Sequence, residues 1–307
     1  MPSVSRNKIM ISFEITSEHD SMRVDRFLFK ATTAPKSLIY KTVRKKDVKV
    51  NGRWVREDYF LKQGDKLTVY IEESFLKSKS IPDCELLADI VFEDENIIVF
   101  NKPPGLPCQS DFNHKGGTLS EMLKSYLYQK GEYNPENELT FSPALSNRLD
   151  VNTRGLVIGA KNAKALRKMN DYIRQRSVRK FYVCLLEKMP SEREKHVSAF
   201  IEKDKKRNTS TISENGKEIS MDYRVLRKTP FGFLTEVELK TGRSHQIRAY
   251  FSSIGCPIAG DSKYGAKKAG GQKLMAYKLI FDFDDSEIFS SLNKKIITAD
   301  YSALFSE

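Results

Sequence analysis

The segment NRLDVNTRGLVIGAKN, residues 147–162, is the part of the chain from which its fold and function can best be interpreted. Asp150 precedes the apolar run 155–160, whose pattern predicts a short buried strand. An acidic residue at the entry to a buried strand is either a turn former or a functional carboxylate. For a lone aspartate the turn is the commoner case, so other parts of the chain must distinguish the two.

The composition indicates a globular protein with a basic surface. The chain has 307 residues, enough for one large domain and a smaller companion with a sizeable core. The net charge of +12 favours a polyanionic partner, although basic composition can also serve solubility alone. The charge is locally concentrated, since five cations fall within residues 36–46: Lys36, Lys41, Arg44, Lys45 and Lys46.

The cysteines and the N-terminal sequence indicate the compartment. Cys84, Cys108, Cys184 and Cys256 are scattered without a Cys-x-x-Cys pair, which favours free thiols over disulfides or structural zinc. The first ten residues lack an apolar signal segment, and no apolar run is long enough to cross a bilayer. We therefore expect a cytoplasmic protein with no membrane partner. The sequence also has no Gly-rich phosphate loop, which argues against a nucleotide cofactor.

Residues 10–75 have the pattern of a small, separate module. MRVDRFLFKA and SLIYKTVRKK predict two helices, the second with Leu38 and Val43 on one side and the basic cluster largely on another. Asn51-Gly52 joins two short β-type runs and is a strong signal for a tight hairpin turn, because both positions tolerate positive φ. GDKLTVYI then alternates polar and apolar residues, as a half-buried strand does.

The rest of the chain predicts a larger domain. Residues 76–88 interrupt the periodicity with Ser, Lys and Pro, so we expect a linker there. Within 89–307 a hairpin turns at residues 93–96, and a helix opens with Thr118 and Glu121 at capping-box spacing. A second helix is predicted in KNAKALRKMNDYIRQ, and strands in KFYVCLLEK, EISMDYRVLRK, GFLTEVELK and KLMAYKLIFDF. The prediction is an α+β fold with a mixed, largely antiparallel sheet.

Two further stretches combine polar residues in ways that packing alone does not require. In KFYVCLL, alternation puts Tyr182 on an apolar strand face, where it is either a core tyrosine or a functional one. TGRSHQIRAYFSSIG predicts a turn and then a helix whose apolar stripe contains Ile247, Tyr250, Phe251 and Ile254. Arg248 lies at the edge of that stripe, and a half-buried guanidinium there requires a carboxylate partner.

Ser244 and His245 are adjacent, which could suggest nucleophilic catalysis. Neighbours in sequence rarely form a catalytic serine–histidine pair, so a serine hydrolase is disfavoured.

Taken together, these motifs resemble a known enzyme family. RLDVNTRGLVI, KFYVCLL and TGRSHQIRAYF occur in the order and approximate spacing of the pseudouridine synthases of the RluA type, and VFEDENIIVFNKPPGLPC looks like that family's opening motif. RVDRFL, PKSLIYKTVRKKDVKVNG and LKQGDKLTV resemble the alpha-L RNA-binding domain that often precedes it. The resemblance implies an alpha-L domain over 10–75, a linker over 76–88 and a pseudouridine synthase catalytic domain over 89–307. The first module looks most like that of members acting on large-subunit ribosomal RNA.

The resemblance also assigns roles. Asp150 matches the catalytic aspartate, Tyr182 the active-site tyrosine, and Arg248 the basic partner of the aspartate, so Asp150 and Arg248 should lie within hydrogen-bonding range. Isomerising uridine breaks the N1–C1′ bond and rejoins the uracil through C5. The carboxylate could attack a sugar or ring carbon or remove a sugar proton, and Tyr182 could stack on the base or help remove the C5 proton. Neither redox change nor hydrolysis is involved, so no cofactor or metal is expected.

The implied partner is RNA, with large-subunit ribosomal RNA favoured and a monomeric enzyme expected. The target base must leave its stack, which costs a few kcal/mol that basic contacts to the RNA backbone can offset. Besides the cluster in residues 36–46, the arginines near the motif residues are candidate contacts, although each could equally be a solvated surface residue: Arg148, Arg154 and Arg243.

Two positions depart from the family pattern. Asn147 stands where the family usually has His, and Arg154 where it usually has Ser. Asn147 can still hydrogen-bond, whereas Arg154 adds bulk and charge just ahead of the predicted strand. These changes favour the alternative interpretation, a non-catalytic RNA-binding or ribosome-assembly protein that retains the fold.

Overall fold

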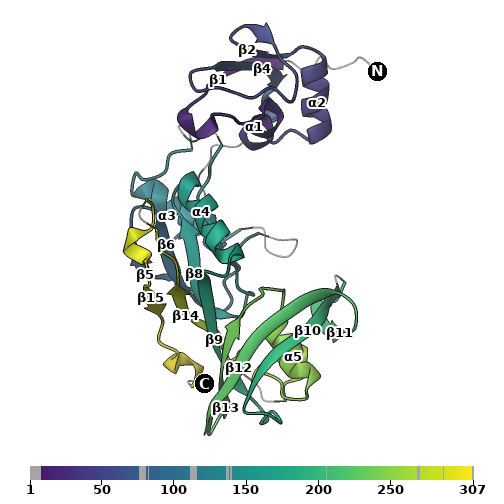
Figure 1. The fold of residues 1–307 in the computed structure, drawn as a ribbon, viewed down its shortest axis with the longest axis vertical. Helices are drawn as coiled ribbons and strands as arrows, with labels where there is room; N and C mark the ends of the chain where they lie inside the picture. Colours follow the sequence, from purple (N-terminus) through teal and green to yellow (C-terminus); the bar gives the residue numbers. More distant parts are fainter. Residues whose placement is uncertain are drawn as a thin grey trace. The chain divides into compact units, whose positions relative to one another are not determined.

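The computed structural model describes most of the chain, namely residues 8–75, 81, 83–110, 116–135, 138, 140–204, 206–267, 270–285 and 287–305. The chain divides into two compact units (Figure 1). The first consists of residues 1–80 and 134–142, and the second of residues 81–133 and 143–307. Part of the expected linker, residues 76–80 and 82, lies outside the described residues. Cys84, Leu86 and Ala88 at its C-terminal end pack against the core of the second unit.

The first unit is a small α+β module. Its elements are β1 (Lys8–Glu14), η1 (Ser17–His19), α1 (Val24–Ala31), α2 (Lys36–Arg44), β2 (Val48–Val50), β3 (Arg53–Trp54), β4 (Lys66–Glu72) and η2 (Glu73–Phe75). The four strands pair antiparallel in the order β1-β4-β2-β3. The hairpin turn is where the sequence predicts it, with Asn51 and Gly52 at φ of 50° and 78°.

The core of the first unit agrees with the predicted periodicity, with one correction. Leu67, Val69 and Ile71 of β4 are buried in alternation, as the pattern of a half-buried strand requires. On α2, Ile39 and Val43 are buried, whereas Leu38, expected in the core, is only half-buried. The strand β1 was not predicted.

The second unit is built on one large sheet. Its elements up to the central strand are β5 (Asp89–Glu93), β6 (Ile97–Lys102), α3 (Leu119–Gln129), β7 (Ala144–Leu145), β8 (Arg154–Ala160), α4 (Ala163–Arg174) and β9 (Val178–Leu186). The remaining elements are β10 (Glu194–Asp204), β11 (Thr209–Ser213), β12 (Lys217–Thr229), β13 (Gly232–Leu239), α5 (Gln246–Ser253), η3 (Ser262–Tyr264), β14 (Leu274–Phe281), η4 (Ser290–Leu292), β15 (Ile296–Thr298) and η5 (Ser302–Leu304).

The strands run in the order β11-β10-β12-β13-β9-β14-β8-β6-β5, with β15 beside β14 and β7 beside β8. Among the strands of the described ranges, only β8 and β14 pair in parallel. The sheet is therefore mixed and largely antiparallel, as the sequence predicts. The predicted helices and strands of this unit are all present, but β7, β10, β11 and β15 were missed.

Both faces of the sheet are covered. Helices α3 and α5 contribute to one apolar cluster, which includes Tyr182 and Cys184 of β9. Helix α4 and the C-terminal segment contribute to the other, which includes Val183 and Leu185 of the same strand. Because β9 supplies alternate residues to two cores, it is the central strand of the layered fold, and it carries Tyr182 on the α3–α5 side.

Gly155 allows the one parallel pairing of the sheet. Its φ is +114°, and a Cβ atom added there would lie 2.1 Å from the carbonyl oxygen of Ala276. Only glycine can adopt this conformation at such close approach to a neighbouring strand. The glycine that opens the predicted strand therefore sets the separation of β8 and β14, just after the Asp150 loop.

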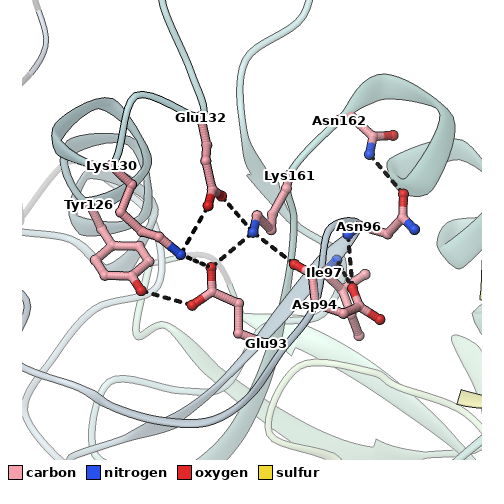
Figure 2. A network of polar contacts seen from close by, with 9 residues as sticks. All are labelled: Glu93, Asp94, Asn96, Ile97, Tyr126, Lys130, Glu132, Lys161 and Asn162. Atoms are coloured by element: carbon pink, nitrogen blue, oxygen red, sulfur yellow. Dashed lines mark hydrogen bonds and ion pairs between the residues drawn. The ribbon is translucent and has the colours of Figure 1, made fainter. Parts of the chain in front are cut away.

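A charged network fastens α3 to the β5–β6 hairpin (Figure 2). The Glu93 carboxylate accepts hydrogen bonds from the Tyr126 hydroxyl at 2.8 Å, from Lys130 Nζ at 2.8 Å and from Lys161 Nζ at 2.9 Å. Glu132 forms ion pairs with both lysines. Burial alone would raise the pKa of Glu93, but the hydrogen bonds from these donors lower it to about 2. The carboxylate is therefore charged throughout the physiological range.

Candidate active site

The second unit contains a cavity of about 520 Å³ into which several sequence motifs converge. Its volume lies in the range typical of small-molecule pockets. The lining includes residues 107–110, residues 148–153, Tyr182, Lys203, Asn208, residues 242–248, Lys263 and Leu274. The predicted site residues Asp150, Tyr182 and Arg248 are thus brought to one cavity from a loop, a central strand and a helix.

Asp150 lies in the loop between β7 and β8, where its backbone forms a turn and its carboxylate makes separate contacts. The Thr153 amide donates to the Asp150 carbonyl oxygen at 3.1 Å, so the backbone makes a turn. The loop is held from the N-terminal side by the Leu149 amide, which contacts Cys108 Sγ at 3.3 Å. The carboxylate is not used to cap this turn, and its side chain retains 26% of its exposure. The backbone of Asp150 therefore forms a turn, and its carboxylate is left for contacts other than capping that turn.

Arg248 holds the Asp150 carboxylate. Its Nη1 donates to Asp150 Oδ2 at 2.9 Å, which confirms the expected pairing across 98 residues of sequence. The same guanidinium binds Asp261 through two hydrogen bonds, Nε to Oδ2 at 2.7 Å and Nη2 to Oδ1 at 2.9 Å. It also lies over the Tyr264 ring, 4.7 Å from the centroid. Arg248 is more deeply buried than expected, at 7% exposure, because it has two carboxylates rather than one.

These contacts determine the charge of the guanidinium. Burial alone would lower the pKa of Arg248, but the hydrogen bonds that it donates to Asp261 and the charge of Asp150 raise it overall. Asp261 is itself 3% exposed and serves as the buried counter-ion. Arg248 therefore remains charged and immobile beside Asp150, and the cation is compensated whether or not Asp150 is ionised.

His245 lies on the other side of the same carboxylate oxygen. Its Nε2 is 3.7 Å from Asp150 Oδ2, and its Nδ1 is 2.7 Å from the Tyr264 hydroxyl oxygen. Burial lowers the pKa of His245, although the negative charge of Asp150 opposes the shift. The imidazole therefore favours its neutral form more than an exposed histidine would.

Tyr182 is buried at 7% exposure and reaches the cavity from β9. Burial raises the pKa of its phenol, and the nearby Asp150 charge adds to the rise, so the hydroxyl keeps its proton. No described residue forms a hydrogen bond with that hydroxyl. An apolar ring with an uncommitted hydroxyl is suited to contact a planar polar ligand.

Lys102 holds the Asp150 loop through hydrogen bonds to backbone carbonyl groups. Its ammonium is fully buried and donates to the carbonyl oxygens of Pro103 at 2.9 Å, Leu106 at 2.8 Å and Val151 at 2.9 Å. All three of its protons are therefore used, and one of them fixes the residue next to Asp150. Burial lowers the pKa of Lys102 to about 8, and the positive charge of Arg154 contributes to the lowering.

The predicted arginines differ in their surroundings. Arg148 and Arg243 are exposed and line the cavity, with hydrogen bonds from Arg148 to the Gln109 side chain at 3.2 Å and from Arg243 to the Glu218 carbonyl at 3.3 Å. Arg154 does not line the cavity. It is half-buried at the start of β8, and its Nε has no hydrogen-bond partner among the described residues.

Asn147 retains a structural role despite its departure from the expected histidine. Its side-chain oxygen accepts the Ile158 amide at 2.8 Å, and its amide nitrogen donates to the Leu156 carbonyl at 3.3 Å. It therefore binds the edge of β8 on both sides of Val157, and the Asp150 loop leaves from a fixed position.

The five cations of residues 36–46 belong to the first unit. All five are exposed on α2 and just after it. Lys36 lies 5.6 Å from the centre of the Phe29 ring, and Lys46 lies 5.5 Å from that of Trp54. They form a basic surface with aromatic residues interleaved.

Several site residues were not found by sequence reasoning. Lys102, Asp261 and Tyr264 hold the Asp150–Arg248 pair, while Lys203 and Lys263 add positive charge to the cavity wall. The expected half-burial of Arg248 indicated that it needs a carboxylate partner, but no feature of the sequence distinguishes Asp261 from other acidic residues. Correspondingly, the predicted apolar stripe of α5 ends at Phe251, because Ile254 caps the helix and is 40% exposed.

The part of the chain that the structure describes offers neither a metal site nor a membrane-spanning helix. No group of three or more His, Cys, Asp or Glu residues there has metal-site geometry. None of the helices within the described ranges combines the length and apolarity needed to cross a bilayer.

Comparison with known proteins gives a consistent result. Residues 96–253 match the family described as RNA pseudouridylate synthase. The chain is 31% identical to an uncharacterized RNA pseudouridine synthase, YlyB, of Bacillus subtilis over 277 residues, which cover 89% of each protein. It is also 31% identical to the ribosomal large subunit pseudouridine synthase C of Escherichia coli, over 83% of this chain and 79% of that protein.

The fold is shared with solved structures of low sequence identity. The structure of human RNA Pseudouridylate Synthase Domain Containing 4 is 22% identical and has a TM-score of 0.54, covering 69% of this chain and 87% of that chain.

Proposed function

Because this chain belongs to the RNA pseudouridylate synthase family and is an RNA pseudouridine synthase, we propose that Asp150 is the carboxylate with which it isomerises uridine. The observation that supports this most directly is the hydrogen bond from Arg248 to Asp150 inside a cavity that also receives Tyr182. The backbone of Asp150 forms a turn, but a carboxylate held by a buried cation beside a cavity is suited to act on a ligand, which supports a functional role for the side chain.

The chemistry requires the glycosidic bond between N1 and C1′ to break and a bond between C5 and C1′ to form. The C5 proton is lost and N1 regains one, so the product is an isomer and no external reagent is consumed. We propose that Asp150 acts as its carboxylate, either as a nucleophile toward carbon or as a base toward a sugar proton. Arg248 would hold the carboxylate in a fixed orientation.

Tyr182 is proposed to receive the uracil ring. Burial raises the pKa of its phenol, which favours stacking and hydrogen-bond donation over removal of a proton by a phenolate. The ring lies on a rigid central strand, so the base would stack against a surface that does not move.

The substrate nucleotide is proposed to flip out of its stack into the cavity. A base paired or stacked in structured RNA cannot otherwise reach Asp150, and unstacking costs a few kcal/mol. Arg148 and Arg243 at the cavity, and the basic surface of α2 in the first unit, are proposed to bind the flanking backbone. Arg154 is retained as a weaker candidate, because its Nε is buried.

Large-subunit ribosomal RNA is the proposed substrate. The basis is the printed name of the Escherichia coli relative and the resemblance of residues 10–75 to an alpha-L RNA-binding domain. Residues 89–307 would then form the catalytic domain, and an enzyme of ribosomal RNA would act in the cytoplasm. A monomer is also proposed, because Asp150, Tyr182 and Arg248 meet in one cavity within a single compact unit, so the site needs no residue from a second copy.

The test is Asp150→Asn, assayed for pseudouridine in an in vitro transcript of large-subunit ribosomal RNA. We expect product from the wild type and none from the variant, with unchanged RNA binding. Asp171→Asn, at a half-buried position of α4 that does not line the cavity, is the matched control and should retain full activity. Full activity in a folded Asp150→Asn variant would remove this residue from the mechanism. Product from other RNAs but not from this transcript would overturn only the substrate assignment.

A further inference from the structure

We propose that His245 is a positioning residue for Asp150, presenting its Nε2–H to the Oδ2 atom that Arg248 also binds and leaving Oδ1 for the substrate. The inference rests on the proposed role of Asp150 as the reacting carboxylate. It assigns separate tasks to the two oxygens of that carboxylate.

The Tyr264 hydroxyl determines which nitrogen of His245 carries the proton. The Ser210 backbone amide donates to this hydroxyl oxygen at 2.7 Å, so that oxygen already accepts one hydrogen bond. Its own proton then needs an acceptor, and His245 Nδ1 lies 2.7 Å away. Tyr264 is only 7% exposed, so an unused hydroxyl proton would carry a desolvation penalty. Nδ1 is therefore the acceptor, and the proton of the neutral imidazole is on Nε2.

The Nε2 proton faces the anchored oxygen of Asp150. Nε2 approaches Oδ2 to 3.7 Å, and Arg248 Nη1 donates to the same Oδ2 at 2.9 Å. Oδ1 receives no hydrogen bond from the described residues. Arg248 fixes Oδ2 by a hydrogen bond, and His245 Nε2 lies beside the same oxygen at a distance longer than a hydrogen bond, so Oδ1 is the oxygen available to a ligand in the cavity.

The backbone of His245 supports a functional reading. The residue precedes α5 with φ of 56° and ψ of 21°, in the left-handed region that non-glycine residues seldom adopt. Its side chain does not cap the helix, although this is the N-cap position. A side chain held in a costly conformation without a capping role indicates that its placement matters for something else.

Burial and the neighbouring cations favour the neutral imidazole. Burial lowers the pKa of His245, Asp150 acts in the opposite direction, and Arg248, Lys263 and Lys203 lower it further. A second proton would have to be placed on Nδ1, where it would oppose the proton of Tyr264. The series of contacts from the Ser210 amide through the Tyr264 hydroxyl and His245 to Asp150 therefore forms only at a pH above the pKa of His245.

The first test compares two amide substitutions at this position. The amide of His245→Gln reaches the place of Nε2, whereas that of His245→Asn reaches only the place of Nδ1. We expect single-turnover pseudouridine formation to fall about tenfold in His245→Asn and to stay near the wild-type rate in His245→Gln, with RNA affinity unchanged in both. Asparagine tolerates the left-handed backbone better than glutamine, so stability should rank the two variants in the opposite order.

The second test needs no RNA. Long-range ¹H–¹⁵N correlation spectra of the histidine-labelled protein should show His245 as a single Nε2–H tautomer, and Tyr264→Phe should convert it to a mixture. A dominant Nδ1–H tautomer in the wild type would overturn the proposal. Equal rates of pseudouridine formation in His245→Asn and the wild type would also overturn the role of His245. If Asp150→Asn is inactive in that case, the proposed function of Asp150 still stands.

Discussion

Asp150 and Asp261 bind one guanidinium but should differ sharply in what they contribute to stability. We compare Asp150→Asn with Asp261→Asn, since both changes replace a carboxylate by an amide of nearly equal size. Asp261 makes two hydrogen bonds to Arg248 from a side chain that is 2% exposed. Asp150 makes one, from a side chain that is 26% exposed.

The expected magnitudes follow from which charge is left without a partner. Removing one partner of a buried ion pair typically costs about 3–5 kcal/mol, and Asp150 still compensates the cation in part, so Asp261→Asn should cost about 3 kcal/mol. In Asp150→Asn the guanidinium keeps its bidentate partner, and the loss should be about 1 kcal/mol or less. Catalysis should show a different order, with Asp150→Asn inactive and Asp261→Asn impaired through misplacement of Arg248.

The measurement is urea unfolding followed by far-UV circular dichroism, with m-values compared to confirm that the transition is the same. Trp54, the chain's single tryptophan, lies in the first unit, so its fluorescence provides a separate record of that unit. Equal losses of stability in the two variants, or an Asp261→Asn protein as stable as the wild type, would refute the argument that Asp261 is the structural counter-ion and Asp150 the functional one.

Three further outcomes are expected. Lys102→Met should destabilise the second unit and slow turnover, because it releases the Val151 carbonyl. The folded pKa of Lys102, about 8, lies below that of an unfolded lysine, so the free energy of unfolding of the wild type should rise relative to that of the variant by about 3 kcal/mol between pH 8 and 10.5. Parallel curves of unfolding free energy against pH would contradict this. Glu93 has a folded pKa of about 2, below its unfolded value, so its contribution to stability is present above pH 4.5 and is lost as the pH falls toward 2. Glu93→Gln should be less stable than the wild type by roughly 2–3 kcal/mol at pH 7, and this difference in unfolding free energy should disappear in acid. A difference that does not change with pH would argue against the network in Figure 2. The logarithm of the RNA-binding constant should fall with the logarithm of salt concentration with a slope of about −0.7 for each single-strand phosphate contacted, and replacing Lys45 and Lys46 by Gln should make this slope shallower. A wild-type affinity that does not change with salt would exclude a mainly electrostatic interface.

The secondary structure could largely be predicted because its signals are local. The capping box at Thr118 and Glu121 is present as predicted, and Asn51-Gly52 forms the expected turn. The strands β10 and β11, the last two at one end of the sheet, were missed because they bury few residues. In β10 only Val197 and Ile201 are buried, which gives no continuous apolar pattern.

The site could be predicted only in part, because its supporting residues are defined by tertiary contact. The pairing of Asp150 with Arg248 could be anticipated, since a buried arginine demands a carboxylate. Lys102 looks like an ordinary residue at the end of a strand, and its burial depends on three carbonyl groups that converge only in the folded chain. The expectation that Arg248 would be half-buried was wrong for the same reason, since Asp261 permits deeper burial.

The path of the chain through the two units has a practical consequence for dissecting them. Residues 134–142 depart from the second unit and return to it, yet they belong to the first, where the Thr140 hydroxyl hydrogen-bonds the ring of His19. A single protease cut within residues 76–80 would therefore leave both fragments tethered by non-covalent contacts. A truncated protein that starts after residue 80 would lack the part of the first unit that residues 134–142 belong with. Isolating the second unit therefore also requires replacing residues 134–142 by a short linker between Tyr133 and Pro143.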